Sequence, residues 1–135
     1  MEAISTKYIL GLVEIPNVLP LEELAGKLGM AIDGINFKKE MSGHFEEVPA
    51  FTAEDANSNA KFILFGIPEG EFGDAYTLEF SAETDAPIQE FKKSTIKFLN
   101  ELLNEKRINS EGFFDYSDEL ANALRVKGIK TCKST

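Results

Sequence analysis

The chain has 135 residues, 43% of them hydrophobic, and a formal net charge of −9 at pH 7. This length fits a single domain spanning 1–135, and the apolar content excludes a wholly disordered chain. The only cysteine, Cys132, excludes an internal disulfide framework and favours a reducing compartment. The longest apolar run, 9–13, is too short to cross a bilayer, and no secretory signal is visible. We therefore expect a cytoplasmic protein without a membrane partner.

The N-terminal third predicts a strand followed by a helix. Residues 7–15 are apolar at both alternating sets of positions, a pattern typical of a central strand covered on both faces, and Pro16 ends the run. Residues 20–30 predict a helix that starts at a proline and has two glutamates in its first turn, where the helix dipole favours acids. Gly29 is its expected stop.

The next segment predicts two weak strands. Residues 35–41 and 45–51 alternate weakly between apolar and polar side chains, and Pro49 favours an edge position for the second strand. Residues 52–60 lack large apolar side chains, so we expect a polar loop with at most one helical turn.

Two stronger strands follow. Residues 61–67 are apolar on both faces, whereas 75–83 alternate cleanly between apolar positions and an acidic outer face that includes Glu79 and Glu83. The turn-rich link 68–74 predicts that these two strands form an antiparallel hairpin.

The C-terminal part predicts two helices. The longer begins at Thr84 or Asp85 and runs to about residue 107, and after a short anchoring segment at 113–114 the second runs from Ser117 to Gly128. Residues 129–135 are expected to be a frayed basic tail. Grouped strands with helices outside the group indicate an α+β fold, with a mostly antiparallel sheet of four to five strands and two to three helices packed against it.

Almost all of the net charge lies in residues 40–90. This segment has a net charge of −11, because it holds one basic residue, Lys61, and twelve carboxylates: Glu40, Glu46, Glu47, Glu54, Asp55, Glu69, Glu71, Asp74, Glu79, Glu83, Asp85 and Glu90. A field of one sign repels nucleic acid and attracts basic surfaces. We therefore expect a basic protein partner and no direct nucleic-acid binding.

No catalytic or cofactor motif accompanies these acids. His44 is the only histidine, and beside Glu46 and Glu47 it has no second imidazole or thiolate at metal-ligand spacing. Because no nucleophile motif or phosphate-binding loop is visible either, we expect no catalytic, metal-binding or cofactor-binding residues.

The acids concentrate on one strand face and on three connections, with aromatic residues between them. Acidic side chains steer association and a buried aromatic side chain supplies affinity, a role that Phe72 fits in its glycine-flanked loop. The expected partner-binding residues are Glu46, Glu47, Glu54, Asp55, Glu69, Glu71, Phe72, Asp74, Glu79 and Glu83. The simpler alternative is that the charge only keeps the protein soluble.

These observations favour a small binding protein that docks on a basic partner and blocks it. The most concrete version is an inhibitor or immunity protein that neutralises a nuclease-type toxin. Two alternatives stay open. One is an enzyme that uses carboxylates, with or without a divalent metal. The other is an assembly or adaptor subunit, which a large exposed apolar patch or a homodimer would favour.

Overall fold

The computed structural model describes residues 6–39, 49–67, 75–104 and 113–131. Within these ranges, strands and helices follow one another as β1 (Lys7–Pro16), α1 (Leu21–Ala31), β2 (Lys38–Lys39), β3 (Ala50–Asp55), β4 (Ala60–Phe65), β5 (Ala75–Thr84), α2 (Ile88–Phe91), the 3₁₀-helix η1 (Lys92–Ser94), α3 (Lys97–Leu102), β6 (Phe114–Asp115) and α4 (Ser117–Val126). The expected α+β class is confirmed.

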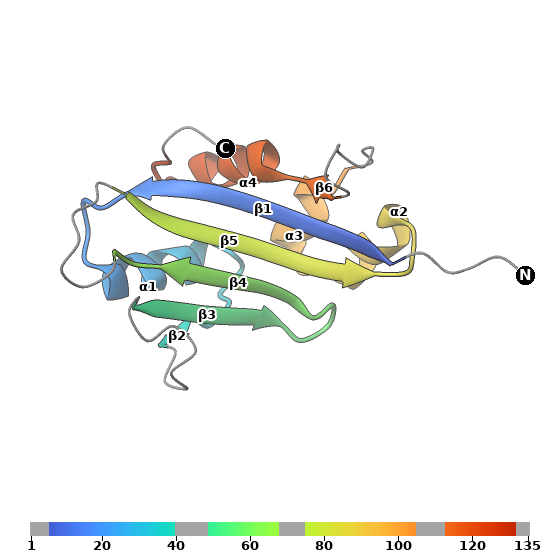
Figure 1. The fold of residues 1–135 in the computed structure, drawn as a ribbon, viewed down its shortest axis with the longest axis horizontal. Coiled ribbons are helices and arrows are strands. Elements are labelled where there is room, and N and C mark those ends of the chain that lie inside the picture. The colour runs from blue at the N-terminus through green and yellow to red at the C-terminus, as the bar shows by residue number, and fades with distance from the viewer. Residues whose placement is uncertain (1–5, 40–48, 68–74, 105–112, 132–135) are drawn as a thin grey trace, which may run out of the picture.

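The described strands form one six-stranded sheet in the order β2-β3-β4-β5-β1-β6 (Figure 1). The predicted antiparallel hairpin of β4 and β5 is confirmed. The sheet is mixed, because β6 runs parallel to β1 while the other pairings are antiparallel. It also has more strands than the four to five expected. Within the expected strand 35–41, the described residues form β2 over only two residues. β6 also has two residues and was not expected as a strand, because it is too short for an alternating pattern to reveal it.

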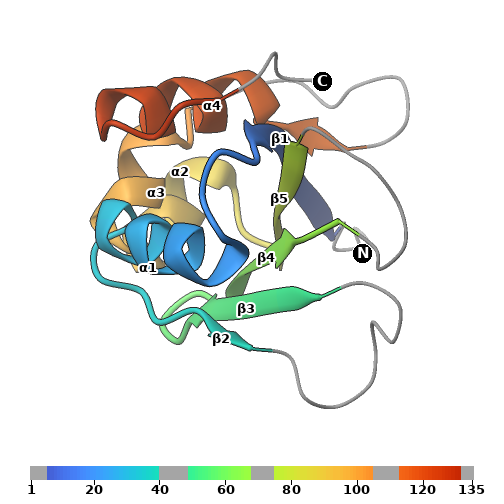
Figure 2. The same cartoon turned by 90° about the vertical axis from the view of Figure 1, so that its left-hand side faces the viewer.

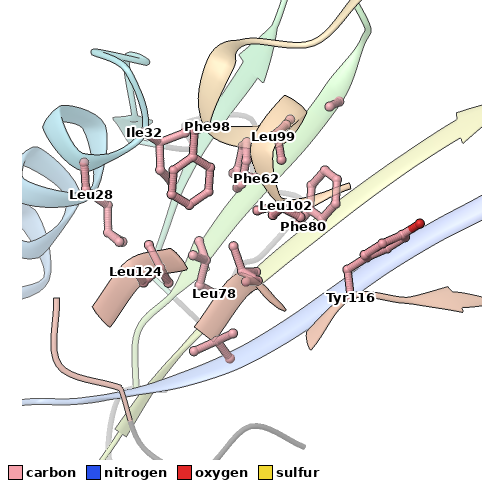
Figure 3. Close-up of a cluster of buried hydrophobic side chains, with 14 of the residues drawn as sticks. Leu28, Ile32, Phe62, Leu78, Phe80, Phe98, Leu99, Leu102, Tyr116 and Leu124 are labelled. Atoms are coloured by element: carbon pink, nitrogen blue, oxygen red, sulfur yellow. The ribbon is translucent and has the colours of Figure 1, made fainter. Parts of the chain in front are cut away.

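The described helices all lie on one side of the sheet (Figure 2). Alternate residues of β1, β4 and β5 point towards them, and the rings of Phe62 and Phe80 stack with centroids 5.3 Å apart. Helices α1, α3 and α4 contribute Leu28, Leu99 and Leu124, each completely buried (Figure 3). The hydrophobic core therefore fills the space between this face of the sheet and the helices.

The expected polar loop at 52–60 is wrong in its first half. Strand β3 continues to Asp55, and the chain then turns so that Asp55 lies opposite Ala60 of β4. The buried carboxylate of Asp55 accepts hydrogen bonds from the Asn57 amide at 3.1 Å and the Ser58 hydroxyl at 2.8 Å. Asn59 completes the turn with a φ of 63°. The inward side chain at the end of β3 is therefore a carboxylate that hydrogen-bonds within the following turn. Because it is not apolar, the sequence has no alternating pattern there that would predict a strand.

The expected long helix from residue 84 or 85 to about residue 107 is also wrong. It is interrupted after η1 by the extended residues Thr95 and Ile96, and α3 ends at Leu102; residues 105–107 lie outside the described residues. Asp55 Oδ2 accepts a hydrogen bond from the Ile96 amide at 3.0 Å, and Asp33 Oδ2 accepts one from the Phe98 amide at 2.6 Å. Carboxylates from distant parts of the chain therefore satisfy the amides at the start of α3.

Of the two longer helices, α1 ends later than expected and α4 ends where expected. Helix α1 passes Gly29 and ends at Ala31; Gly29 is needed because a Cβ there would lie 2.5 Å from the Ile35 carbonyl oxygen. Gly128 does end α4, with a φ of 87°. The next residue, Ile129, is not frayed: its amide donates to the Leu124 carbonyl at 2.9 Å and its side chain is buried.

The open face of the sheet as a candidate binding site

No described helix covers the side of the sheet that faces away from α1–α4 (Figure 2). The expectation that 7–15 and 61–67 form strands covered on both faces is therefore wrong, because each strand has one buried side and one partly exposed side. We call this surface the open face and define it by the outward residues of four strands: Tyr8, Leu10, Leu12, Glu14, Thr52, Glu54, Lys61, Ile63, Phe65, Thr77, Glu79, Ser81 and Glu83.

The open face contains two groups of apolar side chains, one on β1 and one on β4. Leu10 and Leu12 on β1 and Ile63 and Phe65 on β4 are all partly exposed. At the start of β1, Tyr8 is 46% exposed and packs edge-to-face on Phe113, with ring centroids 6.4 Å apart. Apolar side chains at these positions gain from being covered, because they are not fully removed from water in this structure.

Glu79 lies between the two apolar groups. It is directly opposite Leu12 on β1 and Ile63 on β4, so its side chain has an aliphatic neighbour on each side. The Cβ atoms of residues paired in this way lie about 5 Å apart. Glu79 is itself only partly exposed. Among the described residues, the ion pairs join Lys93 to Glu90 and Lys97 to Glu101, and neither includes Glu79.

The charge of the open face is negative. Glu14, Glu54, Glu79 and Glu83 lie on it, with Lys61 opposite Glu54 and Lys38 at the β2 edge opposite Thr52. Of the residues expected from sequence, Glu54, Glu79 and Glu83 are thus brought onto one surface. Glu14 was missed because it lies outside the acid-rich segment 40–90. Its alternation with Leu10 and Leu12 was the signal that could have placed it there.

Asp55 does not belong to this surface. Its side chain points to the helix-covered side and is 4% exposed, so a partner cannot reach it, and we leave it out of the candidate site. The remaining expected residues lie outside the described residues: Glu46, Glu47, Glu69, Glu71, Phe72 and Asp74. His44 and Cys132 lie outside them as well.

The described residues contain neither a group of possible metal ligands nor a helix that could cross a membrane. Within 6–39, 49–67, 75–104 and 113–131, no three histidine, cysteine, aspartate or glutamate side chains gather closely enough to hold a metal ion. In the same part of the chain, no helix has the length and apolar character needed to cross a bilayer.

Comparison with known proteins gives no relative. No protein-family model, no curated protein and no solved structure matches this chain.

Proposed function

We propose that this protein binds a basic partner protein through the open face and blocks it. The observation that supports the proposal best is the position of Glu79 between Leu12 and Ile63. A partner that covers the apolar residues must also remove water from this carboxylate. That removal is costly unless the partner brings a cation, so the surface selects a partner with arginine or lysine among apolar side chains.

The two kinds of side chain have separate roles. Glu14, Glu54 and Glu83 are exposed, so they act mainly on the rate and salt dependence of association. Leu10, Leu12, Ile63 and Phe65 supply the area that is buried in the complex. A basic partner of this kind fits a nuclease, whose cleft must hold phosphates, and the concrete proposal is an inhibitor or immunity protein for a nuclease-type toxin.

The partly exposed apolar side chains also favour a second candidate, an assembly subunit that pairs with a copy of itself. In a symmetric dimer built on the open face, each copy would bring the same four carboxylates to the interface. Like charges brought together in this way oppose association, so a basic partner remains the first choice. Sedimentation analysis of the purified chain at low and high salt separates the two candidates. A dimer that becomes more stable as the salt concentration rises would favour the assembly subunit.

The proposal is tested by capturing proteins from the native host with the tagged chain, identifying a captured protein and measuring its affinity after purification. We expect a basic protein whose affinity falls as salt rises. Glu79→Gln with Glu83→Gln should weaken the complex at least about tenfold, as expected when a cation is left without its partner. The matched control is Glu22→Gln with Glu23→Gln, two exposed acids in the first turn of α1.

The control variant changes the net charge by the same amount on the other side of the sheet, so it should change the affinity less than about twofold. Equal weakening by both variants, or an affinity that does not depend on salt, would argue against the open face. For the toxin version, the captured protein must cleave nucleic acid and lose that activity when the chain is added.

A further inference from the structure

A second candidate site lies on the helix-covered side and shares no residue with the open face. It is a pocket of about 240 Å³ where the end of β1, the β1–α1 connection and the end of α4 meet. Its lining is mostly apolar and consists of Ile15, Pro16, Val18, Leu19, Leu24, Lys27, Gly128, Ile129 and Lys130.

The floor and walls of this pocket are held in place by the fold. Ile15, Leu24 and Ile129 are each buried, and they come from β1, α1 and the residue after Gly128. The Leu19 carbonyl accepts a hydrogen bond from the Tyr76 hydroxyl at 2.8 Å, which ties the β1–α1 connection to β5. Hydrogen bonding of the Ile129 amide to the Leu124 carbonyl fixes the opposite wall.

The charges around the pocket have the opposite sign to those of the open face. Lys27 and Lys130 are exposed at the pocket, and no carboxylate is found among the described residues that line it. In the described part of the chain, neither lysine forms an ion pair. Val18, 75% exposed, extends the apolar lining outwards. An apolar pocket with two cations is complementary to a ligand with an apolar body and one anionic end.

We propose that this pocket binds a small amphiphilic carboxylate with about ten non-hydrogen atoms, such as an aliphatic acid of eight carbons. This size follows by proportion from the roughly 150 Å³ apolar cavity that accepts benzene, a molecule of six non-hydrogen atoms. Its aliphatic chain lies against Ile15, Leu24 and Ile129, and its carboxylate lies between Lys27 and Lys130. Because the pocket shares no residue with the open face, this proposal stands independently of the proposed partner.

Octanoate is the probe, and binding is followed by NMR on the full chain labelled at its methyl groups. We expect saturable binding of one octanoate, with the largest shifts at the methyl groups of Ile15, Leu24 and Ile129. Lys27→Gln with Lys130→Gln should weaken binding about tenfold, because two charge-assisted contacts are lost. Lys38→Gln with Lys61→Gln changes the net charge equally on the open face and should leave the affinity within about twofold.

Octylammonium has the same aliphatic chain and the opposite charge, so it should not shift these three methyl groups. Both lysine pairs are exposed, so the variants are expected to keep the fold, and their unperturbed methyl spectra verify this. Absence of octanoate binding, equal weakening by the two lysine variants, or equal shifts with octylammonium would each overturn the proposal.

Discussion

The two faces of the sheet are made by the same strands and have opposite properties. Along β4, Leu64 is completely buried beneath the helices, whereas its neighbour Ile63 is partly exposed on the open face. Along β3, the carboxylate of Asp55 is buried and hydrogen-bonded, whereas that of Glu54 is exposed. The helix-covered face therefore supplies stability. The open face keeps apolar and acidic side chains partly exposed, and our proposal is that a partner buries them. Neighbouring residues on opposite faces provide matched tests of this difference.

The largest difference is expected between Leu64→Ala and Ile63→Ala. Leu64→Ala leaves a cavity in the core and should lower the free energy of unfolding by about 2–5 kcal/mol. Ile63→Ala removes a side chain of the same composition that is still partly in water, so we expect a loss of about 1 kcal/mol. Urea unfolding followed by circular dichroism measures both values. Equal losses would mean that the open face is covered in the free protein.

The next largest effect concerns the two carboxylates of β3. Asp55→Ala leaves the Ile96 amide, the Ser58 hydroxyl and the Asn57 amide without their acceptor. Because these hydrogen bonds are to a charged group, we expect the free energy of unfolding to fall by about 2–3 kcal/mol. Glu54→Ala, one residue earlier and exposed, should change it by less than about 0.5 kcal/mol. A small effect of Asp55→Ala would show that the start of α3 does not depend on this carboxylate.

A smaller loss is expected for Ser117→Ala, which tests the link between β1 and α4. The Ser117 hydroxyl accepts a hydrogen bond from the Leu12 amide at 2.9 Å and donates one to Asp115 at 2.6 Å. Its removal should cost about 1–2 kcal/mol of unfolding free energy. Ser94→Ala, at an exposed position in η1, is the control and should have almost no effect. If the two variants unfold at the same urea concentration, this link adds nothing to stability.

The smallest effect on stability is expected for Glu79→Gln. Its carboxylate forms no ion pair within the described part of the chain, and the protein carries a net charge of −9. The free energy of unfolding should therefore change by less than about 0.5 kcal/mol, measured by the same urea unfolding. A loss above about 1 kcal/mol would assign Glu79 a structural role and remove it from the proposed binding surface.

The strong elements of the fold could be predicted because their signals are local. The alternation of 75–83, the proline and two glutamates at the start of α1, and Gly128 at the end of α4 each predicted what the structure contains. Prediction failed where a distant group decides the conformation. Asp33 and Asp55 hydrogen-bond to the amides at the start of α3, and no pattern within 84–107 reveals them.

The candidate site was predictable in part for the same reason. The outward positions of Glu79 and Glu83 followed from the alternation of their own strand. The position of Glu79 between Leu12 and Ile63 required the register of β5 with β1 and β4. Asp55 was misassigned because a buried carboxylate and an exposed one look alike in a sequence.

The sequence by itself determined the α+β class, the excess of acids in 40–90 and the strongest strands and helix ends, since these depend on composition and on short-range periodicity. Only the tertiary structure decided that one face of the sheet stays open, that Asp55 is internal and that Lys27 and Lys130 line the same apolar pocket. The physical reason is that burial depends on what packs against a residue. Strand pairing and helix placement bring together residues far apart in the chain, and a local pattern cannot identify these neighbours.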